Sequence, residues 1–596
     1  MLTTLIISSG PIVAGVLGGS EVLKLWPFLR PYRLFVGLVL LLTFLQTTSS
    51  LYLPTLMADI VDHGVITGHV RYIVQVGVEM IGITAIGGAG AVLASLYASL
   101  AMSGMAQRLR SRLFSHVEHF TLREFDHIGT SSLIVRTTND VMQVQQLVAI
   151  GLRMMVMAPL TAIGGVALAI YTAPSLSWIM VVSVPLLALV IWSTMGRGLV
   201  MFRSIQAKVD TLNRVLRENL AGVRVVRAFD RTPYEGRRFD AANRDVTDTS
   251  VRVFQLMAIV QPAVMLVMNL GTVVIVWLGG HEIGAGTLQI GSLMAFIQYV
   301  SQVMFSVMMV SMVMFMIPRA QASALRINEV LAMESDITDP EDPETGTRGS
   351  GTVEFQHVSF AYPGAEEPAL SDISFMARPG RITAIIGGTG SGKSTIMNLI
   401  PRFYDVTGGH IVLDGVDIRA MRQEDLRGRL GYAPARAVIF TGTIADNIRY
   451  GDREASTEAV TRAAEVAQAT EFINEMPEGL DSPISQGGAN LSGGQKQRLS
   501  IARALVRRAD VYLFDDTFSA LDYRTDARLR QALRREVAGA TVIIVAQRVS
   551  TVMDADQILV MDEGRLVGAG RHRDLLDSCA VYREIVSSQL SPEEIA

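Results

Sequence analysis

Apolar residues gather in six long segments in the first half of the chain. Each segment reaches the roughly 20 residues that a helix needs to cross the hydrocarbon core of a bilayer. Buried helices of a soluble core are also apolar, but six such segments with few charges favour membrane spans. We therefore predict an all-α polytopic domain over residues 34–330, embedded in a lipid bilayer. The segments lie at about residues 34–58, 72–102, 145–172, 175–200, 255–279 and 288–317.

The connections between these segments alternate in length and in charge. Two long connections, at about residues 103–144 and 201–254, are rich in arginine, whereas the short ones carry little positive charge. Because basic residues concentrate in cytoplasmic loops, this pattern predicts that the long connections and both termini are cytoplasmic. Basic residues of the long connections include Arg108, Arg110, Arg112, Arg123, Arg136, Arg203, Lys208, Arg214, Arg217, Arg224, Arg227, Arg237 and Arg238.

The helical pattern continues from the spans into both long connections, for example at Met105–Arg110 and Val209–Leu220. We therefore expect the spanning helices to extend beyond the membrane into the cytoplasm. Short elements around Leu122–Ile128 and Val225–Glu235 lie at the far ends of these extensions. They are candidates for docking a second domain, and simple turns between helices are the alternative.

The first 33 residues precede the first span. Residues 1–20 are small and apolar without a cationic segment before them, which argues against a signal peptide and leaves an ordered tail or a disordered extension open. Glu21–Arg33 mixes leucines and Trp26 with basic residues. This mixture suits an amphipathic helix at the membrane surface, with a plain juxtamembrane linker as the alternative.

Some residues in or beside the spans carry candidate chemistry. Glu79 lies near one end of the second segment and is either functional or interfacial. The methionines of the last segment suit a surface that repacks around varied apolar ligands, or simply fill core and lipid-facing positions. The ligand-type group Asp59, Asp62, His63 and His69 sits in a short outer loop and is interpreted as solvated. The methionines are Met294, Met304, Met308, Met309, Met312, Met314 and Met316.

A second domain follows a polar linker. Residues 331–351 are acidic and rich in proline and glycine, which marks a domain boundary. Beyond it, Val353–Tyr362 alternates like a strand, and Ile382–Ile386 and Val511–Asp515 read as buried strands. Residues 352–596 are therefore predicted to form an α/β domain.

The pattern G-x-x-x-x-G-K-[ST] follows one of these strands and opens into a helix. Its glycines let backbone N–H groups turn toward a phosphate at the helix N-terminus. Lys393 would reach the β- and γ-phosphates of ATP, and the Ser394 hydroxyl would bind Mg²⁺. Asp515 ends its strand and fits a second Mg²⁺-holding residue. The loop residues are Gly387, Gly388, Thr389, Gly390, Ser391, Gly392, Lys393, Ser394 and Thr395.

Two further motifs accompany the phosphate loop, in a fixed order along the chain. The signature segment Leu491, Ser492, Gly493, Gly494 and Gln495 precedes Asp515, and the loop Ser519–Asp522 follows it. Behind six spans, this order resembles an ABC exporter half-transporter over about residues 21–585. The resemblance implies that Tyr362 stacks on adenine, that Asp522 belongs to the family's aspartate loop, and that the long cytoplasmic loops are coupling loops.

The resemblance also implies composite ATP sites. In such proteins the signature segment of one ATPase domain clasps the γ-phosphate of ATP bound by a second domain. Each site thus combines residues such as Lys393 from one domain with residues such as Ser492 from the other. One of the two coupling loops would reach across to the partner.

Three positions depart from the family pattern. Asp516 replaces the usual glutamate, which withdraws the carboxylate from the attacking water by roughly one C–C bond, ~1.5 Å. Gln547 replaces the usual switch histidine, and an amide cannot carry the proton chemistry of an imidazole. Ala435 stands where a glutamine that senses Mg²⁺ and water is usual. Together they predict a site that binds ATP and hydrolyses it poorly.

Because a homodimer would repeat these defects, we predict a heterodimer with a second, non-identical ABC half-transporter. The expected activity is ATP-driven export of small hydrophobic or amphipathic compounds of multidrug type, with ATP and Mg²⁺ as cofactors, at a plasma or bacterial inner membrane. A dedicated lipid, peptide or siderophore transporter, or a non-pumping regulatory ATP-binding membrane protein, is the alternative.

Composition adds little to this picture. The mean hydropathy of +0.35 over 596 residues agrees with a membrane domain. A single cysteine, Cys579, excludes an intramolecular disulfide framework. The net charge of −4, without a basic tract, gives no indication of nucleic-acid binding.

Overall fold

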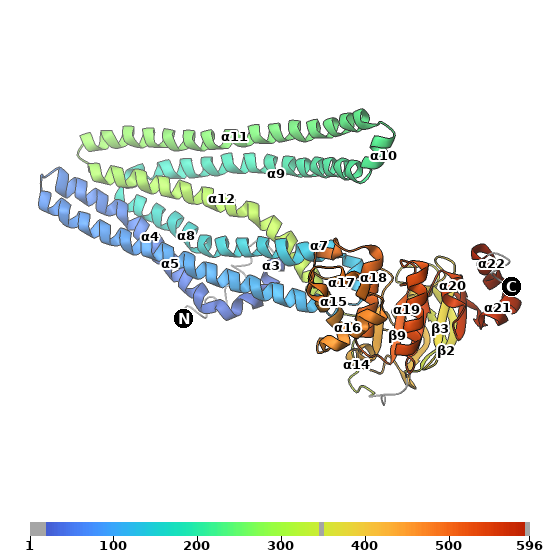
Figure 1. Cartoon of the computed structure of the whole chain (residues 1–596). Coiled ribbons are helices and arrows are strands. Elements are labelled where there is room, and N and C mark those ends of the chain that lie inside the picture. Colours follow the sequence, from blue (N-terminus) through green and yellow to red (C-terminus); the bar gives the residue numbers. More distant parts are fainter. Residues whose placement is uncertain (1–19, 345–350, 591–596) are drawn as a thin grey trace. The chain divides into compact units, whose positions relative to one another are not determined.

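Six long helices make up most of the first half of the protein, as a computed structural model shows (Figure 1). The structure describes residues 20–344 and 351–590, so the tail at residues 1–19 lies outside the described residues. Within them, six helices are long and apolar enough to cross a membrane, which confirms the predicted spans. The long helices are α4 (Arg33–Asp59), α5 (Val70–Val117), α8 (Val141–Thr172), α9 (Trp178–Ala221), α11 (Thr232–Gly284) and α12 (Ile290–Ala332).

Several of these helices are much longer than a bilayer requires. The 53 residues of α11 rise to about 80 Å at 1.5 Å per residue, against a hydrocarbon core of roughly 30 Å. The predicted extension beyond the spans is therefore confirmed. In Figure 1, α9 and α11 run side by side and α10 (Val223–Ala228) joins them at one end.

The long helices pack through small residues. A Cβ atom on Gly165 of α8 would come within 2.7 Å of Val303 in α12, so glycine lets these two helices approach closely. The core of this region includes the fully buried rings of Phe296 and Tyr299. The Tyr299 hydroxyl shares a 2.7 Å hydrogen bond with the Thr55 hydroxyl of α4. Shorter elements precede or connect the long helices: α3 (Ser20–Lys24), η1 (Trp26–Tyr32), η2 (Ile60–Val65), α7 (Thr130–Val135), η3 (Arg136–Asp140) and η4 (Pro174–Leu176).

Two interpretations of this half need correction. The segment before the first span forms the short helix α3 and the 3₁₀ turn η1 rather than one amphipathic helix, because Pro27 and Pro31 remove backbone donors. Its residues Leu25 and Leu29 are buried. Asp62 is also not solvated, since it is 9 % exposed and its Oδ1 accepts a 2.7 Å hydrogen bond from Gly291 N, at the start of α12.

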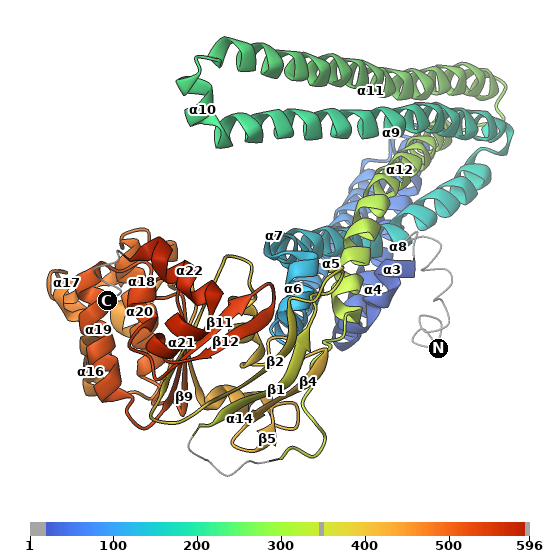
Figure 2. The same ribbon diagram turned by 90° about the vertical axis from the view of Figure 1, so that its right-hand side faces the viewer.

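Contacts divide the chain into two units, and the second contains residues 119–128 together with residues 334–596. Its centre is a six-stranded sheet in the order β12-β11-β3-β10-β9-β6, parallel except for β12. A four-stranded antiparallel sheet has the order β2-β1-β4-β5, and Figure 2 labels its strands. The strands are β1 (Val353–Phe360), β2 (Leu370–Ala377), β3 (Ile382–Gly387), β4 (Gly408–Leu413), β5 (Val416–Asp417), β6 (Leu430–Ala433), β7 (Gly442–Thr443), β8 (Pro483–Ile484), β9 (Val511–Asp515), β10 (Thr541–Val545), β11 (Gln557–Asp562) and β12 (Arg565–Gly570).

Helices cover this central sheet, as the apolar, β-branched strands between them require. The strands β9 and β10 are buried along their whole length, which agrees with the prediction of a buried strand at Val511–Asp515. The helices of this unit are α6 (Leu122–Ile128), α13 (Lys393–Leu399), α14 (Gln423–Gly428), α15 (Ile444–Arg449), α16 (Thr457–Val466), α17 (Thr470–Asn474), α18 (Gly493–Leu505), α19 (Tyr523–Glu536), α20 (Val549–Val552), α21 (His572–Ser578) and α22 (Ala580–Gln589), with the 3₁₀ turns η5 (Gly479–Asp481) and η6 (Gln486–Gly488).

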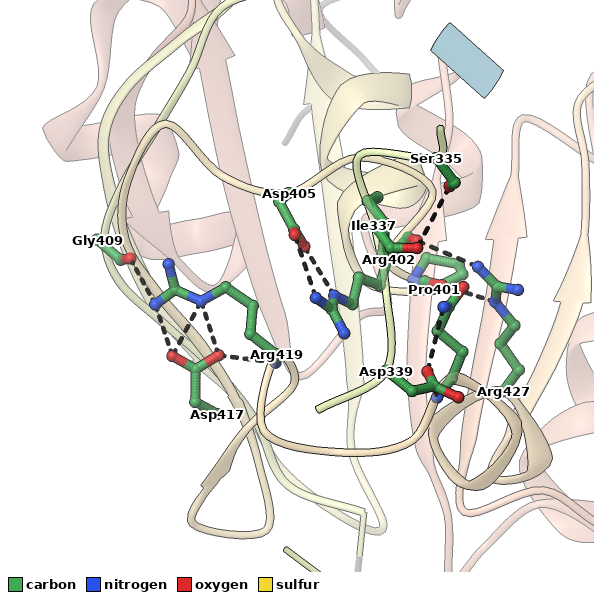
Figure 3. A network of polar contacts seen from close by, with 11 residues as sticks. Ser335, Ile337, Asp339, Pro401, Arg402, Asp405, Gly409, Asp417, Arg419 and Arg427 are labelled. Atoms are coloured by element: carbon green, nitrogen blue, oxygen red, sulfur yellow. Dashed lines mark hydrogen bonds and ion pairs between the residues drawn. The ribbon is translucent and has the colours of Figure 1, made fainter. Parts of the chain in front are cut away.

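The described part of the linker packs on the second unit (Figure 3). Asp339 accepts hydrogen bonds from the backbone N and the side-chain Nε2 of Gln423, at 3.0 and 3.1 Å. Glu344 N donates to Ala420 O at 2.9 Å. The proline-rich composition that marks the linker therefore corresponds to an irregular segment held by specific contacts.

Candidate functional site

The candidate ATP site is built at one edge of the six-stranded sheet. Parallel strands β3, β9, β10 and β6 all end at this edge, because Val545 pairs with both Ile385 and Asp515 and Ala433 pairs with Phe514. The phosphate loop follows β3, Asp516 follows β9 and Gln547 lies two residues after β10. Ligands of such α/β sheets bind at the carboxyl ends of the strands.

Glycine is required at two ends of the phosphate loop. A Cβ atom on Gly387 would lie 2.1 Å from Met561 O, so no side chain fits between β3 and β11. Gly392 has φ +94° and would place a Cβ atom 2.6 Å from Leu370 and 2.8 Å from Ala369 O. Gly392 caps the N-terminus of α13, whose free N–H groups and dipole favour a phosphate.

Lys393 lies folded over this loop. Its Nζ donates hydrogen bonds to Gly387 O at 2.9 Å, Gly388 O at 2.5 Å and Ser391 Oγ at 3.3 Å. Burial lowers the pKa of the Lys393 ammonium, and the nearby carboxylates Asp516 and Asp515 oppose that shift. A desolvated cation whose partners are carbonyls and a hydroxyl is well suited to exchange them for phosphate oxygens.

Ser394 and Asp515 meet at the start of α13. The Ser394 hydroxyl donates to Asp515 Oδ1 at 3.3 Å. Asp515 is 5 % exposed, and burial first, then the charge of Asp516, raises its pKa. A hydroxyl and a buried carboxylate are hard oxygen ligands of the kind that Mg²⁺ prefers, so this pair fits the expected metal.

Asp516 and Gln547 are paired with each other. Gln547 Nε2 donates to Asp516 Oδ2 at 2.8 Å. Asp516 has φ +45°, and its backbone N donates to Val545 O at 2.9 Å, so the backbone of this residue is fixed against β10. Burial raises the pKa of the Asp516 carboxyl, while Ser519, Lys393, Arg548 and Gln547 oppose the shift.

The remaining predicted residues follow strands of the two sheets or belong to the loop itself. Ala435 is exposed in the turn after β6, and its methyl group offers no hydrogen bond. Tyr362 follows β1, and its hydroxyl shares a 3.1 Å hydrogen bond with Thr395 Oγ1 of α13. Gly388, Thr389 and Gly390 form the exposed tip of the loop.

The signature segment forms a separate exposed surface. Ser492 caps α18: its Oγ accepts from Gln495 N at 3.3 Å, and Gln495 Oε1 accepts from Ser492 N at 2.8 Å. Leu491 is buried, which anchors the segment, while Ser492 and Gly493 are exposed. Asp522 caps α19 through a 3.0 Å hydrogen bond from Thr525 N to Oδ1, which lowers its pKa. None of the hydrogen bonds described for these residues reaches Lys393.

The helical half contains a cavity of about 420 Å³. It is lined by amides and hydroxyls together with thioethers and an aromatic ring, and none of its described lining residues is charged. Met309 belongs to this lining, whereas Met304 of the same helix is buried. Lining residues include Gln46, Gln302, Ser50, Thr161, Met157, Met268, Phe305 and Met309.

Two arginines inside the apolar segments predicted as spans were not singled out by the sequence analysis. Arg153 lies in α8, four residues before the cavity-lining Met157, and its Nε is buried without a hydrogen-bond partner in the described part of the chain. Arg197 lies in α9. Average hydropathy hides single charges in long apolar segments, although a charge at such a position is itself a functional signal. Glu79, which was singled out, is exposed on α5.

Comparison with known proteins agrees with this architecture. Residues 36–307 match the ABC transporter transmembrane region, and residues 370–519 match the ABC transporter family model. An uncharacterized ABC transporter ATP-binding protein of Mycobacterium tuberculosis is 42 % identical over 94 % of this chain and 97 % of its own length. A fatty acid ABC transporter ATP-binding/permease protein of Mycobacterium bovis is 35 % identical over 80 % of this chain and 75 % of its own.

A solved structure is also similar. The structure of a bacterial Atm1-family ABC exporter with ATP bound superimposes with a TM-score of 0.76, at 26 % identity, over 94 % of this chain and 99 % of that one. The phosphate loop at the sheet edge, the six long apolar helices and these matches agree with one another. The chain belongs to the ABC transporter family, as a half-transporter whose six-helix transmembrane region is fused to an ABC ATPase domain.

Proposed function

We propose that this chain is one subunit of a heterodimeric ATP-driven exporter, and that its own ATP site binds nucleotide but hydrolyses it poorly. The observation that carries this proposal is the 2.8 Å hydrogen bond between Gln547 and Asp516. The carboxylate that follows the Mg²⁺-associated Asp515 is short and already engaged by an amide. It is therefore poorly placed to accept a proton from water attacking a γ-phosphate above Lys393.

Gln547 cannot replace an imidazole at this position. Its amide donates through nitrogen and accepts through oxygen, but it does not take up a proton at physiological pH. Ala435 removes a third polar group from the same sheet edge. The parts that bind ATP, by contrast, are complete: the glycine loop, Lys393, Ser394 and Asp515. The site would retain ATP with Mg²⁺ for long periods.

The signature segment supports the second part of the proposal. Its first turn is exposed and rigidly capped by the reciprocal bonds of Ser492 and Gln495, which orients the N-terminus of α18 for an anionic group. We infer that this surface clasps ATP bound by a non-identical partner with a competent site. The coupling loops around α6 and α10, a cytoplasmic location of both termini, and the domain boundaries at residues 34–330, 331–351 and 352–596 belong to the same proposal.

The proposed cargo is a small amphipathic compound. The cavity between the helices combines amide and hydroxyl groups with methionine and phenylalanine, which suits a molecule with a polar and an apolar part. Arg153, one helical turn before the lining residue Met157, adds a cation whose buried Nε has no hydrogen-bond partner among the described residues. We infer a preference for cargo with an anionic head, and the fatty acid transporter among the relatives is consistent with it.

The two ATP sites can be tested separately from this chain alone. In a complex with its partner half-transporter, Ser492→Ala weakens the partner's site and Lys393→Ala weakens this chain's site. We expect Ser492→Ala to lower steady-state ATP hydrolysis at least tenfold and Lys393→Ala to lower it less than about threefold. Equal losses in the two variants would contradict the proposal, and ATP-dependent uptake of cargo into inverted vesicles distinguishes a pump from a regulatory ATP-binding protein.

A further inference from the structure

Helix α6 groups with the ATPase domain although it lies between α5 and α7 in the sequence. Its N-terminus is closed by Glu124, which is 5 % exposed and whose Oε2 accepts from Thr121 N at 2.6 Å and also from the Thr121 hydroxyl. In the S/T-x-x-E pattern, the glutamate side chain reaches back in this way to the backbone N–H before the first turn of the helix. The helix therefore presents its next residues in a defined orientation.

Asp126 of this helix contacts Tyr404. The Tyr404 hydroxyl donates to Asp126 Oδ2 at 3.3 Å, a bond between residues 278 positions apart. Burial first, then the charge and hydrogen bond of Asp126, raises the pKa of Tyr404 to about 12. The phenol consequently remains a donor at any pH at which the protein works.

Tyr404 also contacts the expected adenine platform. Its ring lies 5.4 Å from that of Tyr362, with the two planes at 85°, and both rings pack against Phe360. Edge-to-face pairs of this kind depend on mutual ring orientation. Tyr362 in turn shares a hydrogen bond of 3.1 Å with Thr395, so the platform is tied to the helix that follows the phosphate loop.

The segment that carries Tyr404 is held firmly. It follows α13 directly, and Arg427 donates to Pro401 O at 3.1 Å and to Arg402 O at 3.2 Å, as Figure 3 shows. Arg402 forms an ion pair of 2.8 Å with Asp405 (Figure 3). Because the residues on both sides of Tyr404 are fixed, we expect the Tyr404 ring to move when Tyr362 or α13 moves.

We propose that Tyr404 is a positioning residue that transmits ATP binding at Tyr362 and Thr395 to helix α6 through its hydrogen bond with Asp126. The proposal rests on the function proposed above, in which this chain's own site retains ATP. The retained nucleotide then has a role. Adenine stacked on Tyr362 fixes the orientation of the Tyr362 and Tyr404 rings, and the Tyr404 hydroxyl, held in place, stabilises α6 through Asp126. A second contact, the ion pair of Arg123 with Asp336 of the linker, keeps α6 docked when the site changes occupancy.

Hydrogen–deuterium exchange of the peptide covering residues 119–128 tests this path in the full-length complex in lipid nanodiscs. In the native protein, saturating Mg²⁺-ATP should slow exchange of this peptide at least fivefold. In Tyr404→Phe, which keeps the ring and removes the hydroxyl, ATP should bind within twofold of native affinity, by fluorescence of a trinitrophenyl-ATP analogue, while the slowing falls below twofold. Asp126→Leu should behave like Tyr404→Phe, and Asp126→Asn, which keeps an acceptor oxygen, should restore most of the protection.

Tyr432→Phe is the matched control, because Tyr432 packs on Phe403 of the same segment at 5.9 Å and is not part of the Tyr404–Asp126 contact. It should leave the ATP-dependent protection unchanged. Full protection in Tyr404→Phe, or native protein that binds ATP without protecting residues 119–128, overturns the inference alone. Native protein that binds no ATP at the Lys393 site overturns the proposed function and this inference together.

Discussion

Gln547 donates a 2.8 Å hydrogen bond to Asp516 Oδ2, so two of the three unusual residues of the ATP site are paired with each other. A catalytic carboxylate needs a free oxygen lone pair directed at water, and a switch residue needs to reach the γ-phosphate. In this pair the two side chains point toward one another. Changes at one member are therefore expected to depend on the identity of the other.

Restoring hydrolysis should need more than one substitution. In a Ser492→Ala background, which suppresses the partner's site, Asp516→Glu alone should raise residual ATP hydrolysis less than about threefold, since Gln547 still engages the carboxylate. Adding Gln547→His and Ala435→Gln should raise it tenfold or more, toward the ~10²-fold lower range of general-base catalysis. Phosphate release at saturating ATP measures both, and a large gain from Asp516→Glu alone would show that side-chain length is the sole defect.

The phosphate loop should not tolerate a side chain at Gly392. Gly392→Ala places a residue with a Cβ atom at φ +94° and 2.6 Å from Leu370, which costs about 1–3 kcal/mol in strain. We expect ATP binding to weaken at least tenfold and the melting temperature of the nucleotide-free protein to fall. Gly539→Ala, where nothing lies within 4 Å of the new methyl group, is the control and should change neither quantity.

Asp515 should matter only in the presence of Mg²⁺. Asp515→Asn keeps the shape of the side chain and the contact with Ser394, but removes the charge that a divalent cation requires. We expect the affinity for ATP to fall at least tenfold with Mg²⁺ and to stay within twofold in EDTA. Titration of a fluorescent ATP analogue under both conditions measures this, and an equal loss in EDTA would place Asp515 in direct contact with nucleotide instead.

Much of this molecule is predictable from local pattern. The length of the apolar segments predicts the six spans, and the spacing of glycines before Lys393 predicts the phosphate loop. Both features depend on residues that are close together in the sequence. The burial of Asp62 was not predicted, because its hydrogen-bond partner, Gly291 N, is 229 residues away in the sequence. The residues next to Asp62 carry no signal of that bond. The Tyr404–Asp126 contact was not predicted either, because these two residues are also far apart in the sequence. The break between α3 and η1 could have been read from Pro27 and Pro31, whose effect on helices is local.

Removing the charge of Arg153 should change which amphiphiles the transporter accepts. A buried guanidinium Nε without a partner is costly in a membrane domain, and an anionic head group on the cargo would offset that cost. In the nucleotide-free complex, Arg153→Gln should weaken binding of palmitate at least fivefold and leave binding of hexadecanol, which has the same chain without the carboxylate, within twofold. Arg153→Lys should recover part of the loss, because it restores charge without the planar fork.

Arg197→Gln provides the control for this prediction. Arg197 lies in α9 beside a different set of residues, including Arg252, Gln255 and Ile259, and is not among those that line the 420 Å³ cavity. The substitution removes an arginine from an apolar helix as Arg153→Gln does, so it reports any general effect on folding or on lipid contacts. We expect palmitate binding by Arg197→Gln to stay within twofold of the native protein. Equal losses in both variants would show that the arginines act through phospholipid head groups, and equal weakening of palmitate and hexadecanol by Arg153→Gln would show that the cavity selects cargo by its apolar part alone.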